Sequence, residues 1–211
     1  MTHGLKLSSG ILFGTAAVAT AGFVALARAI AAGKTVRWDR RAKRAVHSAR
    51  EGSSARALSV ASYATTPLGK WWGHVPAALV TAAKLRREKR NAAAFTIAGT
   101  SVAAALLPSL LDRVTLRRPP PPERHEPQKQ SFPSGHALQT SAMAIATGYV
   151  MRREDLVSPA WLALGTLSLS TGLARLILDR HWTSDVAAGY CAGVALGTTS
   201  SGLYELARSN E

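Results

Sequence analysis

Two short clusters of polar residues stand out in the C-terminal half of the chain. The first reads Pro133-Ser134-Gly135-His136 and precedes a largely apolar stretch. A Pro-Ser-Gly sequence before such a stretch predicts the start of a helix, where exposed N–H groups and the helix dipole favour an anion. Ser134 adds a hydroxyl donor, and His136 adds a side chain that takes up and releases protons near neutral pH.

The second cluster has the spacing Arg-x5-His-x3-Asp and consists of Arg175, His181 and Asp185. His181 and Asp185 are four residues apart and share one face of a helix that begins near His181. The carboxylate can then hold one imidazole nitrogen and leave the other as a nucleophile. The planar guanidinium of Arg175 suits phosphate oxygens. Taken singly, the clusters could be a helix cap and a structural pair; together they predict one site for an anionic substrate.

Long stretches without charge surround these clusters. Residues 91–111, 156–174 and 186–204 contain no charged side chain over 21, 19 and 19 positions. A bilayer core about 30 Å thick needs roughly 20 helical residues. We therefore expect an all-α polytopic membrane protein, a six-helix bundle with the active site at helix ends on one membrane face. The expected helices are 10–32, 57–83, 91–111, 135–151, 157–176 and 184–205.

The order of these helices predicts which loops lie together. Two helices separate the clusters, so both clusters return to the same face, together with loops 34–56 and 112–134. Both termini and the loop 84–90 fall on the opposite face. The helix over 57–83 is interrupted by Pro67, Gly69, Lys70, His74 and Pro76. Such a segment would have to be a kinked helix sheltered by its neighbours.

Two alternatives concern the apolar stretches. A soluble helical bundle rich in alanine also has uncharged buried helices, but three uncharged runs bracketed by Lys or Arg argue against it. Gly189, Gly193 and Gly197 add the small-residue spacing that lets helices approach closely in lipid. The N-terminal stretch resembles a signal peptide, yet its apolar part is longer than a usual signal core, which favours an uncleaved helix.

The composition excludes several classes of protein. The 211 residues include 26 Lys and Arg against 12 Asp and Glu, a net charge of +14. Because 47% of the residues are hydrophobic, a disordered basic chain is excluded. The single Cys191 excludes an internal disulfide framework and a cysteine-built zinc site. No aromatic interleaving accompanies the basic residues, so we expect no nucleic-acid partner.

The basic residues form clumps, one of which lies near the N-terminus. Residues 34–56 hold eight Lys and Arg against two acids. This segment predicts a loop or short helix on the membrane surface, attracted to anionic headgroups. An ordinary solvated loop is the alternative.

The two clusters resemble motifs of the type-2 phosphatidic acid phosphatase superfamily, which includes membrane lipid phosphatases, acid phosphatases and vanadium haloperoxidases. The family pattern is K-x6-R-P, then P-S-G-H, then S-R-x5-H-x3-D. The second motif is intact, and the third departs only at Ala174, where the family has Ser. The resemblance covers about residues 57–205. We therefore expect one membrane-embedded phosphatase domain over 1–211, with a helix at 10–32 and a basic loop at 34–56 appended to that core.

The first motif is degenerate in this chain. No lysine begins it, and the segment 112–125 offers four arginines: Arg113, Arg117, Arg118 and Arg124. Arg117-x6-Arg124 keeps the spacing but lacks the following proline, whereas Arg118-Pro119 keeps only the Arg-Pro pair. We favour Arg118 and Arg113 as phosphate ligands.

The resemblance implies a role for each residue of the other two motifs. His181 would attack phosphorus and form a phosphohistidine, and Asp185 would orient it. His136 would protonate the leaving alkoxide and then activate water. Arg175, Ser134 and the Gly135 N–H would hold the phosphate oxygens. No metal and no cofactor is expected.

The resulting hypothesis is a metal-independent lipid phosphate phosphatase in the cell membrane. Its substrate would be phosphatidic acid, phosphatidylglycerophosphate or a polyprenyl (di)phosphate, reached from the bilayer. The alternatives are a non-catalytic membrane protein that binds anionic lipid, and a haloperoxidase-like or acid-phosphatase-like enzyme with a non-lipid substrate. The sequence leaves open the oligomeric state and the membrane face that carries the site.

Overall fold

The computed structural model describes residues 2–50, 55–122, 130–156 and 160–209, and these residues form helices but no strands. The all-α fold is as expected. The helices are α1 (Thr2–Ala31), α2 (Val36–Arg50), α3 (Ala55–Ala64), the 3-10 helix η1 (Thr66–Gly69), α4 (Trp71–Arg87), α5 (Asn91–Val114), α6 (Gly135–Arg153), α7 (Ala160–Ile177) and α8 (Thr183–Arg208).

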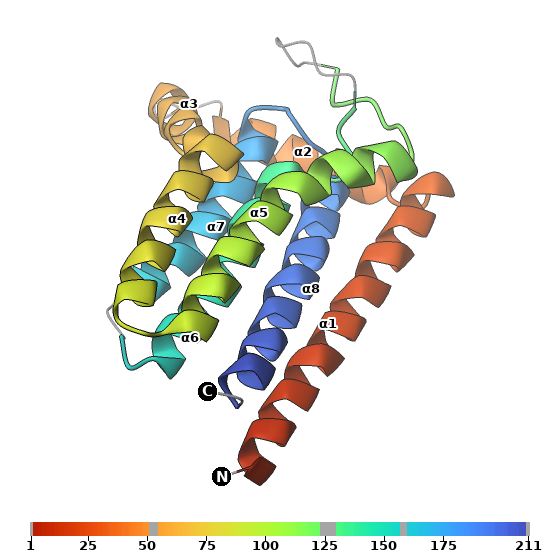
Figure 1. The fold of residues 1–211 in the computed structure, drawn as a ribbon. Helices are drawn as coiled ribbons and strands as arrows, with labels where there is room; N and C mark the ends of the chain where they lie inside the picture. The colour runs from red at the N-terminus through yellow and green to blue at the C-terminus, as the bar shows by residue number, and fades with distance from the viewer. Residues whose placement is uncertain (1, 51–54, 123–129, 157–159, 210–211) are drawn as a thin grey trace.

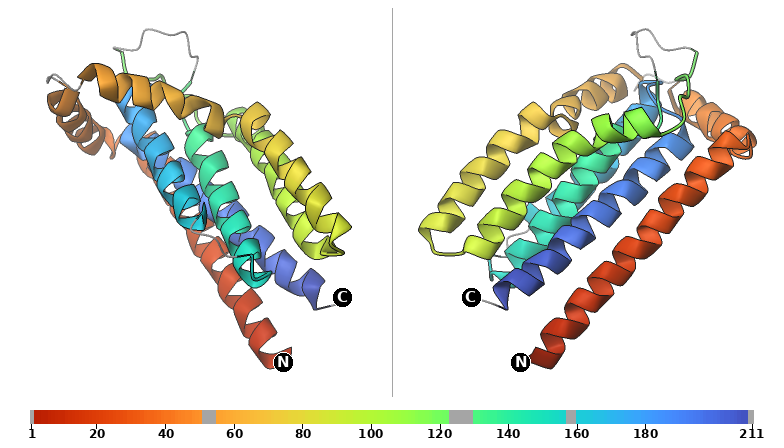
Figure 2. Two further views of the ribbon diagram at one scale, coloured as in Figure 1. Left: turned by 90° about the vertical axis from the view of Figure 1, so that its left-hand side faces the viewer. Right: turned by 45° about the vertical axis from the view of Figure 1, so that its right-hand side comes forward.

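The long helices run side by side, and the short ones lie across one end of the bundle. Helices α1 and α4 to α8 share one general direction, whereas α2 and α3 lie across their ends (Figures 1 and 2). Helix α8 is central, because it packs against α1, α5, α6 and α7. Both termini lie at the end opposite α2 and α3 (Figure 1), as the helix order predicted.

The number of helices differs from the six expected. The described residues form eight α-helices and one 3-10 helix. The segment 57–83, expected as one kinked helix, is divided among α3, η1 and α4, since Pro67 lacks the N–H that a continuing α-helix needs. The basic segment 34–56 contains helix α2, so of the two predicted forms, a loop or a short helix, it takes the helix. Residues 157–159, the expected start of the fifth helix, lie outside the described residues.

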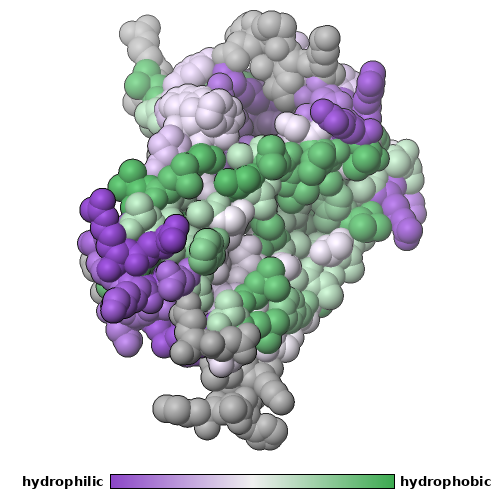
Figure 3. All heavy atoms as spheres, in the orientation of Figure 1, coloured by the Kyte–Doolittle hydropathy of each residue, from purple (hydrophilic) through white to green (hydrophobic). Residues whose placement is uncertain are grey.

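Two helices of the described chain are long and apolar enough to cross a membrane: Ser9–Ala31, with mean hydropathy 1.9, and Asn91–Val114, with mean hydropathy 1.7. The apolar part of α7, Ala163–Ile177, is shorter. Figure 3 shows a hydrophobic band across α5 and its neighbours, with hydrophilic surface on both sides of it. Phe95, Leu106 and Leu110 are large hydrophobic residues exposed on α5, which fits a lipid-facing surface.

Helix α8 is rich in small residues and packs against several other helices. Its glycines permit a close approach to α6. A Cβ at Gly193 would overlap Ser141 Oγ and lie 2.5 Å from the Leu138 carbonyl oxygen, and a Cβ at Gly197 would lie 2.9 Å from the Ala142 carbonyl oxygen. The two backbones are therefore too close for any larger residue.

A polar cluster ties the helices together at the end that carries the termini. The buried Glu205 accepts hydrogen bonds from Tyr149 Oη at 2.8 Å and from Arg153 Nη2 at 3.0 Å. Glu154 accepts from Tyr204 Oη and from Arg90 Nη1. These bonds connect α5, α6 and α8 and satisfy charges that would be costly to bury alone.

The glycine contact leads to a stability prediction. Gly193→Ala should destabilise the bundle by about 1–3 kcal/mol, lowering Tm by roughly 2–12 °C, because overpacking forces α6 and α8 apart. Gly99→Ala is the matched control, since nothing lies within 4 Å of a Cβ at Gly99 in α5. Thermal unfolding in detergent measures both, and an equal response of the two variants would contradict the prediction.

Candidate active site

The start of α6 is fastened to the start of α8. Ser134, which precedes the first residue of α6, donates its backbone N–H to the Asp185 carbonyl oxygen at 3.1 Å. A Cβ at Gly189 would overlap the Ser134 carbonyl oxygen, so α8 can approach only because Gly189 has no side chain. Beside this contact, the buried Phe132 stacks on Phe23 of α1 with ring centroids 5.8 Å apart. The P-S-G-H sequence thus begins a helix, as predicted, in a fixed position.

His181 lies in the short connection between α7 and α8 and is buried. Its Nδ1 is 2.6 Å from the carbonyl oxygen of Ser131. Because a carbonyl oxygen only accepts hydrogen bonds, Nδ1 carries the proton in this arrangement. Nε2 is then the nitrogen with the lone pair, as a nucleophile requires.

Asp185 lies one turn beyond His181, and its carboxylate binds other partners. Oδ2 accepts the backbone N–H of Trp182 at 2.8 Å, and Oδ1 accepts from Arg118 Nη1 at 2.7 Å. The Ser131 carbonyl thus makes the contact at Nδ1 that the sequence assigned to Asp185. Asp185 instead caps the first turn of α8, where a negative charge is favoured by the helix dipole.

Arg118 lies between two buried carboxylates. Its Nη2 is 2.7 Å from Asp39 Oδ2, and its side chain is only 13% exposed. Asp39, on α2, also accepts the backbone N–H of Ser184 at 2.9 Å and its hydroxyl at 2.8 Å. Two negative charges already offset the guanidinium, which weighs against Arg118 as the main phosphate ligand. Asp39 and Ser184 were missed by the sequence analysis, although an acid within a basic run was a signal for Asp39.

Arg175 is fully buried near the C-terminal end of α7. Its Nη2 donates to Thr66 Oγ1 at 2.7 Å. Thr66 is the first residue of η1, so the interruption between α3 and α4 is what brings this hydroxyl to the guanidinium. No sequence pattern pointed to Thr66, because 109 residues separate it from Arg175.

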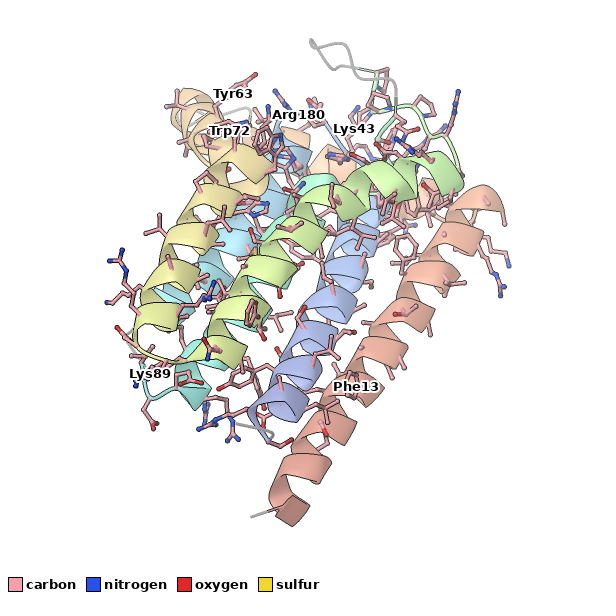
Figure 4. The ribbon with its side chains drawn as sticks, in the orientation of Figure 1. Phe13, Lys43, Tyr63, Trp72, Lys89 and Arg180 are labelled. Carbon is pink, nitrogen blue, oxygen red and sulfur yellow. The ribbon has the colours of Figure 1, made fainter. Side chains whose placement is uncertain are left out.

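His136 lies in the first turn of α6, close enough to interact electrostatically with Arg175, His181, Lys70 and Arg180. Within the described part of the chain, its Nε2 and the Ser134 hydroxyl are buried without a hydrogen-bond partner. Buried polar atoms are normally satisfied, so a bound oxyanion would complete both. Figure 4 shows Arg180 and Lys43 at this end of the bundle and Lys89 at the opposite end.

The structure thus brings together residues of both clusters and adds two cations, Lys70 and Arg180.

Only some of the first-motif arginines lie near these residues. Arg113 lies exposed at the C-terminal end of α5, and Arg117 is also exposed. Arg124 lies outside the described residues. Gly135 packs against Pro108 of α5, whose Cβ would be 3.2 Å from a Cβ at Gly135.

Across the residues that the structure describes, no three His, Cys, Asp or Glu side chains form a group that could hold a metal ion. The arrangement can bind a tetrahedral oxyanion between Arg175 and the start of α6. It also presents one histidine as a nucleophile and a second histidine for proton transfer.

The sequence model of the PAP2 superfamily matches residues 90–208. The chain belongs to this family. A lipid A 1-phosphatase of Porphyromonas gingivalis is 37% identical over 68 residues, which are 32% of this chain and 15% of that protein. The crystal structure of a transmembrane PAP2-type phosphatidylglycerolphosphate phosphatase from Bacillus subtilis superimposes with a TM-score of 0.73. That match covers 93% of this chain and 98% of the other at 19% identity.

These comparisons confirm the resemblance found in the sequence. The PAP2 chain shares the fold of that transmembrane phosphatase, and its helices α1 and α5 are long and apolar enough to cross a membrane. The matched segment spans 15% of the curated relative's length.

The position of Arg118 leads to a prediction that distinguishes a structural role from a role as phosphate ligand. Arg118→Ala should lower the free energy of unfolding by about 3–5 kcal/mol, because it leaves Asp39 and Asp185 buried without their cation. Arg113→Ala, at an exposed position, should change stability by less than about 0.5 kcal/mol. Unfolding in detergent and kcat/KM are measured for both. Unchanged stability with a large loss of kcat/KM in Arg118→Ala would favour the phosphate-ligand role instead.

Proposed function

We propose that this PAP2 protein is a metal-independent lipid phosphate phosphatase, which hydrolyses a phosphomonoester or diphosphate on a membrane lipid through a phosphohistidine. One observation carries the proposal. The buried Ser134 hydroxyl and His136 Nε2 lack partners within the described residues and lie in a cationic site with Arg175 and His181. A substrate phosphate would satisfy both atoms and offset the positive charge.

In the first step, His181 Nε2 attacks phosphorus in line with the leaving oxygen. The N–P bond forms as the P–O bond to the lipid breaks. Arg175, the Ser134 hydroxyl and the Gly135 N–H hold the other phosphate oxygens, which supplies the electrostatic stabilisation that dominates phosphoryl transfer. The Ser131 carbonyl keeps the imidazole in the required orientation and tautomer.

His136 handles the protons of both steps. It first donates a proton to the alkoxide of the lipid as that group leaves. In the second step it takes a proton from water, whose oxygen attacks the phosphohistidine and releases orthophosphate. The cycle returns both histidines to their starting states. Asp185 and Arg118 act in this scheme by fixing the start of α8.

The case for a lipid substrate rests on the membrane fold and on a groove beside the site. Phosphatidylglycerolphosphate and lipid A are named as substrates of the two relatives. Helices α4, α6 and α7 line an apolar groove of about 290 Å³. Thr140 in its wall lies one turn beyond His136 and bonds to the His136 carbonyl at 2.8 Å. An acyl or prenyl chain in this groove would leave its phosphate at the site. The cell membrane is the proposed location.

A phosphatase assay on mixed micelles tests the function. The wild type should release orthophosphate from phosphatidic acid, phosphatidylglycerophosphate or a polyprenyl phosphate, and His181→Ala should abolish the release, because no other group forms the covalent intermediate. If the folded wild type releases none from any of these lipids, the non-catalytic alternative is favoured.

The division of labour between the histidines predicts different responses to the leaving group. His136→Ala should retain activity toward a nitrophenyl phosphate, whose leaving group needs little protonation, and should lose most activity toward a lipid phosphate. His181→Ala should be inactive toward both substrates. Equal rescue of the two variants by the nitrophenyl ester would contradict these roles.

Inhibitors test the proposed transition state. Vanadate should inhibit at low concentration, because it adopts the trigonal-bipyramidal geometry of phosphoryl transfer. EDTA should leave the rate unchanged. Inactivation by EDTA that Mg²⁺ or Zn²⁺ reverses would show that the mechanism needs a metal.

A further inference from the structure

Lys70 is a cation near the proposed site that the mechanism above does not use. It lies between the 3-10 helix η1 and Trp71, the first residue of α4. Its side chain is exposed. Within the described ranges, no carboxylate forms an ion pair with its ammonium. Lys70 also lies outside residues 90–208, which match the family model, so none of the motifs indicates it.

A histidine one turn later fixes the position of Lys70. The Lys70 carbonyl oxygen accepts the backbone N–H of His74 at 3.3 Å, so one helical turn separates the two residues. His74 Nε2 is 2.8 Å from Gln139 Oε1 on α6, and its Nδ1 is 2.8 Å from Ser101 Oγ on α5. Because an amide oxygen only accepts, Nε2 donates to Gln139 and Nδ1 accepts from the Ser101 hydroxyl. These bonds tie α4 to both neighbouring helices.

The same bonds place Lys70 beside the start of α6. Gln139 follows Gly135 by four residues, as His74 follows Lys70. Both helices begin at the end of the bundle that carries the site and run in the same direction (Figures 1 and 2). A contact in the second turn of each helix therefore brings their starts together. In agreement, η1 packs against α6, and the charge of Lys70 acts on His136.

Two tryptophans indicate that Lys70 lies at the level of the lipid headgroups. Trp71 and Trp72 follow it directly and are 61% and 49% exposed. Figure 4 shows Trp72 at the same end of the bundle as Arg180. Exposed tryptophans are typical of the boundary between the hydrocarbon core and the headgroups. A lysine at this boundary keeps its ammonium in the polar layer, where the phosphate of a membrane lipid lies.

The groove assigned to the lipid chain begins close to Lys70. Gly73 and His74, the third and fourth residues of α4, line this groove together with Thr140 of α6. Thr140 lies one turn beyond His136, and Lys70 precedes Gly73 by three residues. Lys70 is therefore at the end of the groove nearest His136. A lipid with its chain in the groove and its phosphate at His136 would pass Lys70 where chain and headgroup join.

The substrate brings more charge than one arginine offsets. A phosphate monoester carries up to two negative charges near neutral pH, and the proposed mechanism uses Arg175 as its one cation. Arg118 is bound by two carboxylates. Arg180 lies against the ring of Tyr63, 5.8 Å from its centroid. The ammonium of Lys70, on a flexible stem, can offset the second charge.

We propose that Lys70 is a further substrate-binding residue, whose ammonium contacts a non-bridging oxygen of the lipid phosphate. The assignment rests on the proposed function and adds a group from outside the segment that matches the family model. His181 attacks phosphorus on one side, and the lipid oxygen leaves on the opposite side, toward His136 and the groove. Lys70 binds one of the oxygens between these two positions and stabilises the charge on it in the transition state.

Removing the charge of Lys70 tests the contact. Lys70→Met should lower kcat/KM about 10- to 100-fold, somewhat less than the loss of a buried oxyanion donor, because Lys70 is exposed. The loss should be similar for a lipid phosphate and for a nitrophenyl phosphate, since the contact is made to the phosphate and not to the chain. Lys70→Arg keeps the charge and should retain kcat/KM within about fivefold.

The matched control is Lys84→Met, which removes the same charge from an exposed position on the same helix. Lys84 lies about 20 Å further along α4 at 1.5 Å per residue, beyond a Debye length of about 8 Å. Its loss should leave kcat/KM within about twofold. Thermal unfolding checks that both variants fold, as expected for exposed side chains. Equal losses in the two variants would overturn the contact. So would a loss confined to the lipid substrate, which would show attraction to the lipid surface only.

Binding of orthovanadate separates this contact from the proposed function. Its affinity is measured by the shift of the unfolding temperature, without any turnover. Lys70→Met should weaken binding about tenfold, and Lys84→Met should not. This pattern without turnover of any lipid phosphate would refute the phosphatase alone. Turnover by the wild type, with vanadate bound equally well by Lys70→Met, would refute the role of Lys70 alone.

Discussion

The buried ion cluster of Arg118, Asp39 and Asp185 is the interaction on which the geometry of the site depends. It joins α2, the segment after α5 and the first turn of α8, three parts of the chain that are distant in sequence. Removing water from three charges is costly, so the cluster holds only while its geometry is complete. The Ser134 N–H bonds to the backbone of Asp185, and the start of α6 therefore depends on the same cluster.

This cluster also distinguishes Arg118 from Arg175 by the partners that each guanidinium binds. Arg118 is bound by two carboxylates, whereas Arg175 makes its 2.7 Å bond to the neutral hydroxyl of Thr66. In the proposed function, the guanidinium of Arg175 would meet the substrate phosphate at the start of α6. At the opposite end of the bundle, Glu205 and Glu154 are bound by Arg153 and Arg90. The buried carboxylates at that end are thus paired with arginines, as Asp39 and Asp185 are paired with Arg118 at the other end.

The sequence predicted the parts of the site that depend on short spacing. P-S-G-H and Arg-x5-His-x3-Asp mark the starts of α6 and α8 because helix capping is a local property. The apolar stretches predicted five of the six expected helices correctly, because an uncharged run of this length is also a local feature of the sequence. The family was also identified correctly. The roles of the individual site residues remain predictions.

The parts that could not be predicted depend on contacts between distant segments. Asp39 and Ser184 are 145 residues apart, and no local pattern relates them. The segment 57–83 was expected as one helix because its prolines were judged compatible with a kink. The segment is instead interrupted at η1, and this interruption places the Thr66 hydroxyl within hydrogen-bond distance of Arg175. Asp39, an acid within a basic segment, accepts the buried N–H of Ser184, and Thr66, between two helices, accepts a hydrogen bond from the buried Arg175.

Helix α2 connects this cluster to a basic pocket lined by Arg40, Lys43, Arg44, His47, Pro122 and Trp182. Asp39 is 1% exposed and is held by Arg118 and Ser184, so it fixes the rotation of α2 about its axis. Arg40, Lys43 and Arg44 follow Asp39 on the adjacent side of the helix, since each residue advances the rotation by about 100°. Their direction toward Trp182 is therefore set by the same carboxylate that holds Arg118. One buried acid thus sets the orientation of the whole basic face of α2.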